Sequence, residues 1–252
     1  MPVIDDEFYR DCWSHWSDTC NLDFVVQNKM PIPYFGDVGA YMQSEPRVIT
    51  VALNPNLDVF PCTRCNGVLE PKETERRLSV YFREREIAGD LPRWFSSYKH
   101  VLEGAGYSYL GPDNVALHAD LCSPIATDPT WGALTPKQRS TLLEPGRRIF
   151  SALCERLQPN LIFVSLSRDE VAHQWSDPRG GEWQTLVIFA ERENGAPRIP
   201  PYEVRYTVID CGDERRTMIV FGPPMQGRPF GGISPKQRRA VGRQAMEVLT
   251  NI

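Results

Sequence analysis

The stretch RVITVALNPNLDVFP, residues 47–61, decides the predicted fold. Its run VITVA, residues 48–52, is apolar and mostly β-branched, which is typical of a buried strand. Asn54-Pro55 ends this strand, because proline has no N–H and forces the preceding residue out of the helical region. Ligands of open α/β folds lie beyond the carboxyl ends of parallel strands, so we expect chemistry at Asn54 and Asn56. On its own, an Asn-Pro pair favours an ordinary turn.

Three later apolar segments end in the same way, at residues 114–121, 160–167 and 217–221. Helices are predicted at residues 5–20, 71–88, 93–105 and 136–157 (with a bend at Pro145-Gly146), and again after Ser234-Pro235. Residues 183–191 and 202–211 alternate like a hairpin, with a proline-rich turn at 197–201. This pattern predicts an α/β fold: a three-layer α/β/α sandwich with a central, mainly parallel four-stranded sheet and an extra β-hairpin. No linker is evident, so residues 1–252 are predicted to form a single domain.

The bulk composition predicts a cytoplasmic monomer. The 252 residues are 41% hydrophobic and 24% charged, as in ordinary soluble proteins. No apolar run approaches the ~20 residues of a membrane helix, and the acidic beginning MPVIDDEFYR is unlike a signal peptide. Seven cysteines at irregular spacing indicate reduced thiols rather than a disulfide framework.

Charge is distributed unevenly along the chain. The net charge of −4 argues against a non-specific polyanion binder. Between residues 215 and 246, however, seven basic residues occur without any Asp or Glu: Arg215, Arg216, Arg228, Lys236, Arg238, Arg239 and Arg243. This pattern indicates one cationic surface that meets a phosphate backbone. A solvated basic helix is the alternative interpretation.

Two strand ends resemble motifs of the uracil-DNA glycosylase superfamily. Leu53-Asn54-Pro55-Asn56 resembles the family's first motif, a small or apolar residue, Asp or Asn, Pro, and then Tyr or Gly. FGPPMQGR, residues 221–228, resembles the Pro/Ser-rich loop that wedges into DNA. The resemblance covers about residues 31 to 250 in element order, but only the first motif matches closely in letters. It implies an enzyme without a cofactor that flips a nucleotide out of DNA and hydrolyses its N-glycosidic bond.

The resemblance gives Asn54 and Asp120 the central roles. Asn54 would bind and orient the attacking water, since the oxocarbenium-like transition state needs placement more than deprotonation. Asp120 stands where the family uses an Asn to read the Watson–Crick edge of uracil, with His118 as the competing residue. An ionised carboxylate only accepts hydrogen bonds, which favours the N4 amino group of cytosine, whereas a protonated one also donates to N3. Alternatively, Asp120 caps a loop or pairs with an arginine.

Asn56 is expected to lie beside the edge of the base that carries C5. Uracil-specific members of the family place a tyrosine there, which blocks substituents at C5. The smaller Asn56 leaves that side open, so we expect a cytosine with a bulky polar C5 group, such as the hydroxymethyl or glucosylated cytosines of some phage genomes. Such an activity would serve anti-phage defence; uracil repair is the alternative. Phe60, or else Phe35, is expected to stack on the flipped base, unless either residue is simply core.

The final motif supplies the predicted DNA contacts. Met225 and Gln226 would fill the space that the flipped nucleotide leaves, with Arg228 on a flanking phosphate. Further phosphate contacts are expected from Ser234 at a helix amino end, and from Lys236, Arg238 and Arg239. The family's His or Asn at the start of this motif is missing, and Gly222 stands near its position. Either His118 substitutes for it, or the protein binds a nucleic acid or nucleotide without cleaving it.

Cys62-x-x-Cys65 resembles half of a zinc or iron–sulfur site. A second CxxC pair is missing from the sequence, and only Cys12 and Cys20 are near enough in sequence to complete a site. We therefore predict no bound metal.

Overall fold

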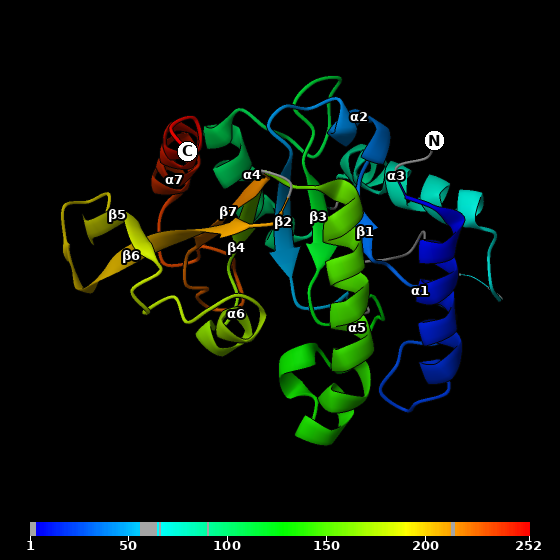
Figure 1. The fold of residues 1–252 in the computed structure, drawn as a ribbon. Helices are drawn as coiled ribbons and strands as arrows, with labels where there is room; N and C mark the ends of the chain where they lie inside the picture. Colours follow the sequence, from blue (N-terminus) through cyan, green and yellow to red (C-terminus); the bar gives the residue numbers. More distant parts are fainter. Residues whose placement is uncertain (1–3, 56–64, 66, 90, 213–214) are drawn as a thin grey trace. The chain divides into compact units, whose positions relative to one another are not determined.

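The computed structural model describes residues 4–55, 65, 67–89, 91–212 and 215–252 (Figure 1). These residues form a mixed α/β structure with a mixed sheet of seven strands, which confirms the predicted α/β class. The chain divides into two compact units: unit 1 is Met1–Met42, Val51–Gly89 and Leu117–Gln158, and unit 2 is Gln43–Thr50, Asp90–Ala116 and Pro159–Ile252. Among the described residues, no helix is both long enough and apolar enough to cross a membrane.

Unit 1 contains the helices α1 (Asp6–Thr19), α2 (Val38–Met42), α3 (Pro71–Ala88), η2 (Trp131–Ala133) and α5 (Pro136–Leu157). Helix α1 begins at Asp5, whose carboxylate accepts a hydrogen bond from the N–H of Phe8 at 2.8 Å. Its aromatic face is buried against neighbouring helices: Trp13 Nε1 donates to Thr74 Oγ1 on α3 at 3.0 Å. This contact orients α1 against α3 within the unit.

Helix α5 is held close to the loop that follows the second predicted strand. The helix begins with a capping box at Thr135. It continues as one helix from Pro136 to Leu157, although it includes Pro145. A Cβ atom at Gly146 would overlap the carbonyl of Cys122. Glycine at this position therefore lets the helix backbone touch the loop backbone.

The strands of unit 1 are β1 (Tyr34–Phe35), β3 (Leu117–Asp120) and the last residues of β2 (Val48–Ala52). Strand β1 pairs antiparallel with β3, with Phe35 opposite His118. Every residue of β2 is buried, as predicted. At the ends of β2 and β3, Leu121 N donates to Ala52 O at 2.9 Å, which holds the two strand ends together.

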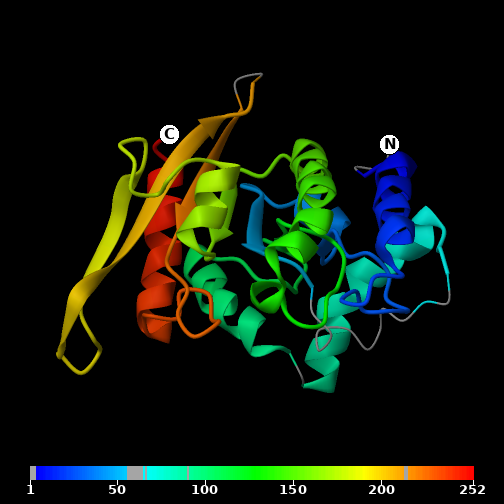
Figure 2. The same cartoon turned by 90° about the horizontal axis from the view of Figure 1, so that it is seen from below.

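Unit 2 contains α4 (Arg93–Ala105), α6 (Arg168–Gln174) and α7 (Pro235–Leu249), with strands β4 (Leu161–Val164), β5 (Gln184–Glu191), β6 (Pro197–Asp210) and β7 (Arg216–Phe221). Strands β4 and β7 are parallel, β6 is antiparallel to β7, and β5 is antiparallel to β6. Figure 2 shows α7 (red) lying alongside this hairpin. Helix α7 begins at Ser234-Pro235 with a capping box, as predicted.

The predicted β5–β6 hairpin is confirmed, but its predicted turn at residues 197–201 is wrong. The chain turns earlier, where Arg192 N donates to Ala196 O at 2.8 Å, and residues 197–201 belong to β6. Between the pairs Glu191–Pro197 and Phe189–Tyr202, β6 has several more residues than β5. The prolines therefore stand in an irregular bulge, where a missing N–H costs no ladder hydrogen bond.

Candidate functional site

Two neighbouring strand ends of unit 1 carry the predicted catalytic and base-reading residues. Leu121 N donates to Ala52 O at 2.9 Å, and Cys122 N donates to Leu53 O at 2.8 Å. The two segments therefore run in the same direction. Asn54 lies two residues after the end of β2, and Asp120 is the last residue of β3. The structure thus places the backbones of the two residues at adjoining strand ends.

The side chain of Asn54 fixes the loop after β3. Its Nδ2 donates to Ile125 O at 3.2 Å and to Thr127 Oγ1 at 2.9 Å, while Thr127 N donates to Pro55 O at 3.2 Å. These contacts use both hydrogens of the amide nitrogen. The group of Asn54 that is left for an incoming water is its acceptor, Oδ1.

His118 and Asp120 form a buried pair on one face of β3. His118 Nε2 lies 3.9 Å from Asp120 Oδ1, which is longer than a hydrogen bond. The two residues are 1% and 4% exposed, respectively. Burial raises the pKa of Asp120 well above its usual value and lowers the pKa of His118 to about 3. Burial therefore favours the protonated form of the carboxyl and the neutral form of the imidazole.

Phe35 packs in the core of unit 1. Its ring centroid lies 5.9 Å from that of His118 and 4.5 Å from that of Tyr81 on α3, and the residue is 1% exposed. This is the core role that we weighed against stacking on a base. The other stacking candidate, Phe60, lies outside the described residues, as do Asn56 and Cys62.

The predicted absence of a metal stays a prediction. Cys65 is buried, and this burial raises the pKa of its thiol. Within the described residues, no cluster of three or more His, Cys, Asp or Glu side chains is arranged to hold a metal ion.

In unit 2, Ser165 after β4 anchors the loop that follows β7. Its Oγ donates to Gly222 O at 2.6 Å and accepts from Phe230 N at 2.8 Å. A Cβ atom at Gly222 would overlap the ring of Phe230, which is fully buried. The space beside Gly222, near which the resemblance would place a His or Asn, is therefore filled by a neighbouring aromatic ring.

The segment Met225–Arg228 is a tight, exposed turn. Met225 N donates to Arg228 O at 3.1 Å, and Arg228 N donates to Met225 O at 3.0 Å. The two central residues, Gln226 and Gly227, have φ angles of 51° and 67°, as a type I′ turn requires. Met225 is 52% exposed. The predicted wedge residues thus stand on a short, hydrogen-bonded projection.

Some basic side chains of the predicted cationic surface are already paired with other groups of the protein. Arg239 forms two 2.8 Å contacts with Glu103 on α4, and Arg238 Nε donates to Phe230 O at 3.0 Å. The hydroxyl of Ser234 accepts the N–H of Gln237 as a helix cap. Lys236 and Arg228 are exposed. Of the predicted phosphate contacts, these last two are the most accessible.

A cavity of about 550 Å³ in unit 2 holds basic residues that our sequence analysis missed. It lies between the β5–β6 hairpin, α6 and the loop after β7, and its lining includes Arg168, Arg179, Arg192, Arg198 and Arg205. In the sequence these arginines are scattered singly, several beside acidic residues, so no charge run marks them. The signal that could have revealed them is the predicted hairpin, whose pairing gathers distant residues.

The chain matches no protein-family model and no curated protein. The resemblance to uracil-DNA glycosylases is therefore carried by the residues of the two motifs.

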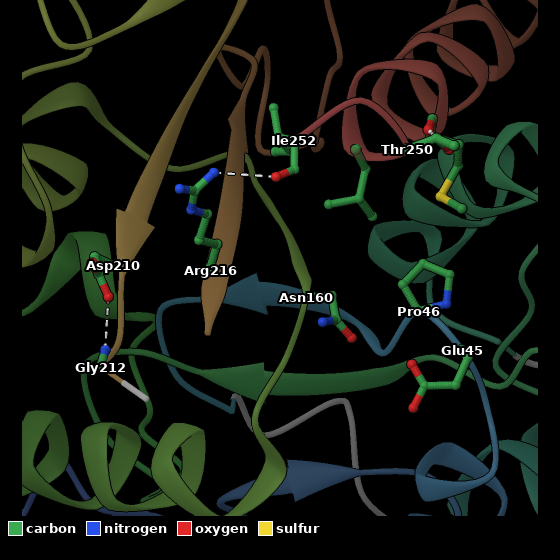
Figure 3. A pocket seen from close by; sticks show the side chains of 10 residues that line it. Glu45, Pro46, Asn160, Asp210, Gly212, Arg216, Thr250 and Ile252 are labelled. Atoms are coloured by element: carbon green, nitrogen blue, oxygen red, sulfur yellow. Dashed lines mark hydrogen bonds between the residues drawn. The ribbon is translucent and has the colours of Figure 1, made fainter. Parts of the chain in front are cut away.

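The largest of the cavities described lies at the other end of the parallel strands (Figure 3). It has a volume of about 1060 Å³, and its lining includes Asn160, just before β4, and Arg216, the first residue of β7. Arg216 Nη1 donates to Ile252 O at 3.2 Å. Because ligands of such folds bind beyond the carboxyl ends of the strands, this cavity is not the predicted site. The described linings of both cavities lack Asn54, His118 and Asp120.

Proposed function

We propose that the protein is a DNA glycosylase that flips out a base and hydrolyses its N-glycosidic bond. The observation that carries this proposal is the placement of Asn54 and the buried Asp120, whose pKa is raised, at adjoining strand ends of unit 1. The proposal includes the finer fold, a three-layer sandwich around a mainly parallel four-stranded sheet. Support for that fold comes from the parallel pair β4–β7 and the like direction of the chain at residues 52–53 and 121–122.

Asn54 orients the water in this mechanism. Its Nδ2 is occupied by Ile125 and Thr127, so the amide plane is fixed and Oδ1 accepts a hydrogen bond from the water. The water oxygen adds to C1′ as the bond to the base breaks, and the base leaves with the bonding electrons. The water then loses a proton to solvent, and the departed base takes one up from solvent, which completes the hydrolysis. Placement of the water within a fixed frame is the main contribution of the protein to this step.

His118 assists the departing base as a hydrogen-bond donor. With its pKa lowered to about 3, the imidazole carries no positive charge at neutral pH, so it stabilises the base through a neutral N–H. The missing histidine of the last motif makes this role necessary. The burial of His118 supplies a low-dielectric setting in which one donated hydrogen bond is strong.

Asp120 reads the base through a carboxyl that both donates and accepts. Its O–H donates to N3 of cytosine while its other oxygen accepts from the N4 amino group. With the proton retained, the same group also pairs with N3–H and O4 of uracil. Only ionisation restricts it to donors such as the cytosine amino group. We propose a cytosine substrate, with a polar C5 substituent beside Asn56, and uracil as the competing base.

A second function is favoured by the contact between Gly222 and Phe230. Because the ring fills the site of a side chain at position 222, the family's leaving-group residue has no place there. A protein without that residue and without a substitute binds nucleic acid or a nucleotide but does not cleave it. The second candidate is therefore a non-catalytic binder of the same fold.

The deciding experiment compares DNA that contains cytosine, uracil, 5-hydroxymethylcytosine or glucosylated 5-hydroxymethylcytosine. Each substrate is incubated with the protein and treated with alkali, which breaks the strand at abasic sites. We expect breaks at the modified cytosines. DNA binding without abasic sites on any substrate would support the non-catalytic candidate instead.

A further inference from the structure

We propose that the arginine-lined cavity of unit 2 binds consecutive phosphates of a nucleic-acid strand that passes beside the Met225–Arg228 turn. The inference rests on the proposed function for the nature of the ligand, and it adds a phosphate site that the uracil-DNA glycosylase motifs do not contain. The cavity includes Met225, Pro223 and Pro224 in its lining, so it adjoins the proposed wedge directly.

The lining of the cavity is strongly cationic. It includes five arginines and one carboxylate, that of Glu203. A single phosphodiester carries one negative charge, so this excess of positive charge matches several phosphates better than one. On a protein whose net charge is −4, such a concentration of arginines marks a local site rather than a general property of the surface.

Two of the arginines are fixed by contacts within the protein, and the first of them, Arg198, is held by uncharged acceptors alone. Arg198 donates from Nε to Glu191 O at 3.2 Å, from Nη2 to Gln237 Oε1 at 3.0 Å, and from Nη1 to Gly232 O. These three acceptors are uncharged, so the guanidinium keeps its full charge in a fixed position. Such a fixed cation attracts an anion without paying the entropy of ordering a long side chain.

Arg205 is held in a similar way. It donates from Nη2 to Trp183 O at 2.6 Å and from Nη1 to Pro178 O, while its Nε lies 3.4 Å from Glu203 Oε1. The carbonyl contacts connect the hairpin to the segment after α6. Arg205 and Arg198 thus give the cavity its framework as well as part of its charge.

Arg179 and Arg192 are the two exposed arginines of the lining. Within the described part of the chain, the structure shows no hydrogen-bond or ion-pair partner for either guanidinium. A guanidinium of this kind can make two parallel hydrogen bonds to phosphate oxygens. The rim also carries Ile199, which is 93% exposed in the β6 bulge and offers an apolar surface beside the phosphates.

The test measures DNA affinity against salt concentration for Arg179→Gln/Arg192→Gln. A matched control, Lys72→Gln/Arg83→Gln, removes the same charge from two exposed positions on α3. We expect the cavity variant to bind a plain duplex roughly tenfold more weakly near 0.1 M salt, with a salt slope smaller by about 1 to 2. The control should stay close to wild type. Equal loss in the two double variants would overturn the proposal.

Further experiments test which ligand the cavity binds, and they distinguish failure of the phosphate site from failure of the proposed function. Inorganic phosphate and a mononucleotide are tested as competitors at constant ionic strength; displacement of DNA by either at low concentration would show a small-anion site and overturn the strand proposal. Arg179→Lys/Arg192→Lys keeps the charge and should keep most of the salt slope. If no base is excised from any DNA yet the two double variants still differ, the proposed function fails and the phosphate site stands. Excision of a base, together with equal salt slopes of DNA affinity in the two double variants, would overturn only the proposed phosphate site.

Discussion

His118 Nε2 lies 3.9 Å from Asp120 Oδ1 inside unit 1, and burial disfavours the charged form of each side chain. The two residues are two positions apart on β3, so their side chains share one face of the strand. Desolvation outweighs their mutual attraction: an ion pair at this distance would lower the pKa of Asp120, and burial raises it. Burial thus favours a pair that offers hydrogen-bond donors and acceptors in place of charge, which is what the proposed recognition of a neutral base would need.

Asp120→Asn should change how stability depends on pH. Above the usual pKa of Asp the unfolded chain ionises while buried Asp120 keeps its proton, so the free energy of unfolding of the wild type falls as pH rises toward the raised pKa. The slope from this group is about 1.4 kcal/mol per pH unit. Asparagine cannot titrate, so the free energy of unfolding of the variant should increase relative to that of the wild type as pH rises from about 4. Urea unfolding at several pH values measures this, and a constant difference would show that Asp120 titrates normally.

His118→Gln should slow excision by about a hundredfold and leave DNA affinity unchanged, because it replaces the rigid imidazole N–H with a flexible amide that no longer holds its donor against the departing base. Since burial lowers the pKa of His118 to about 3, the wild-type rate should show no step from this group between pH 5 and 8. Single-turnover kinetics across this range provide the measurement. His173→Gln, at an exposed position on α6, serves as the control. A rate that rises and falls with a histidine-like pKa, and loses this dependence in His118→Gln, would contradict the neutral role.

Asn54→Ala should lower excision by at least about a hundredfold, since the water loses its orienting acceptor. The substitution also removes the hydrogen bonds to Ile125 and Thr127, which should cost about 1–2 kcal/mol of stability. Thr127→Val removes one of these bonds but keeps the Asn54 side chain. Thermal unfolding should therefore report a smaller loss of stability for Thr127→Val than for Asn54→Ala, and only Asn54→Ala should lose excision. Equal loss of activity would reduce Asn54 to a loop anchor.

The predictable part of the fold is the part that hydrophobic patterning controls. The run at residues 48–52 is buried on both faces, as its β-branched pattern predicts, and helix starts at Pro136 and Pro235 follow from their caps. The β5–β6 turn was misplaced because prolines usually mark turns. Here an irregular bulge accepts them, and bulges depend on pairing between strands that local sequence does not specify.

The sequence could predict only those residues of the candidate site that lie at the end of a single strand. Asn54 and Asp120 follow from where two apolar runs end. The contact of Phe230 with Gly222 was not predictable, because it depends on how the loop after β7 folds back onto Ser165. The arginine-lined cavity was missed for the same reason. Tertiary contacts assemble it from residues that have no common spacing.

Gly222→Ala tests whether the ring of Phe230 really closes the family's histidine position. The added Cβ would overlap a ring that has no free space, so the free energy of unfolding should fall by about 1–3 kcal/mol. Gly181→Ala is the matched control, because no atom lies within 4 Å of its added Cβ, and its effect should stay below about 0.5 kcal/mol. Phe230→Leu removes the ring, so in the double variant the alanine should cost less, with a coupling of about 1 kcal/mol or more. Additive losses in this cycle would mean that the ring does not occupy the site, and the histidine position would again be open to a catalytic side chain.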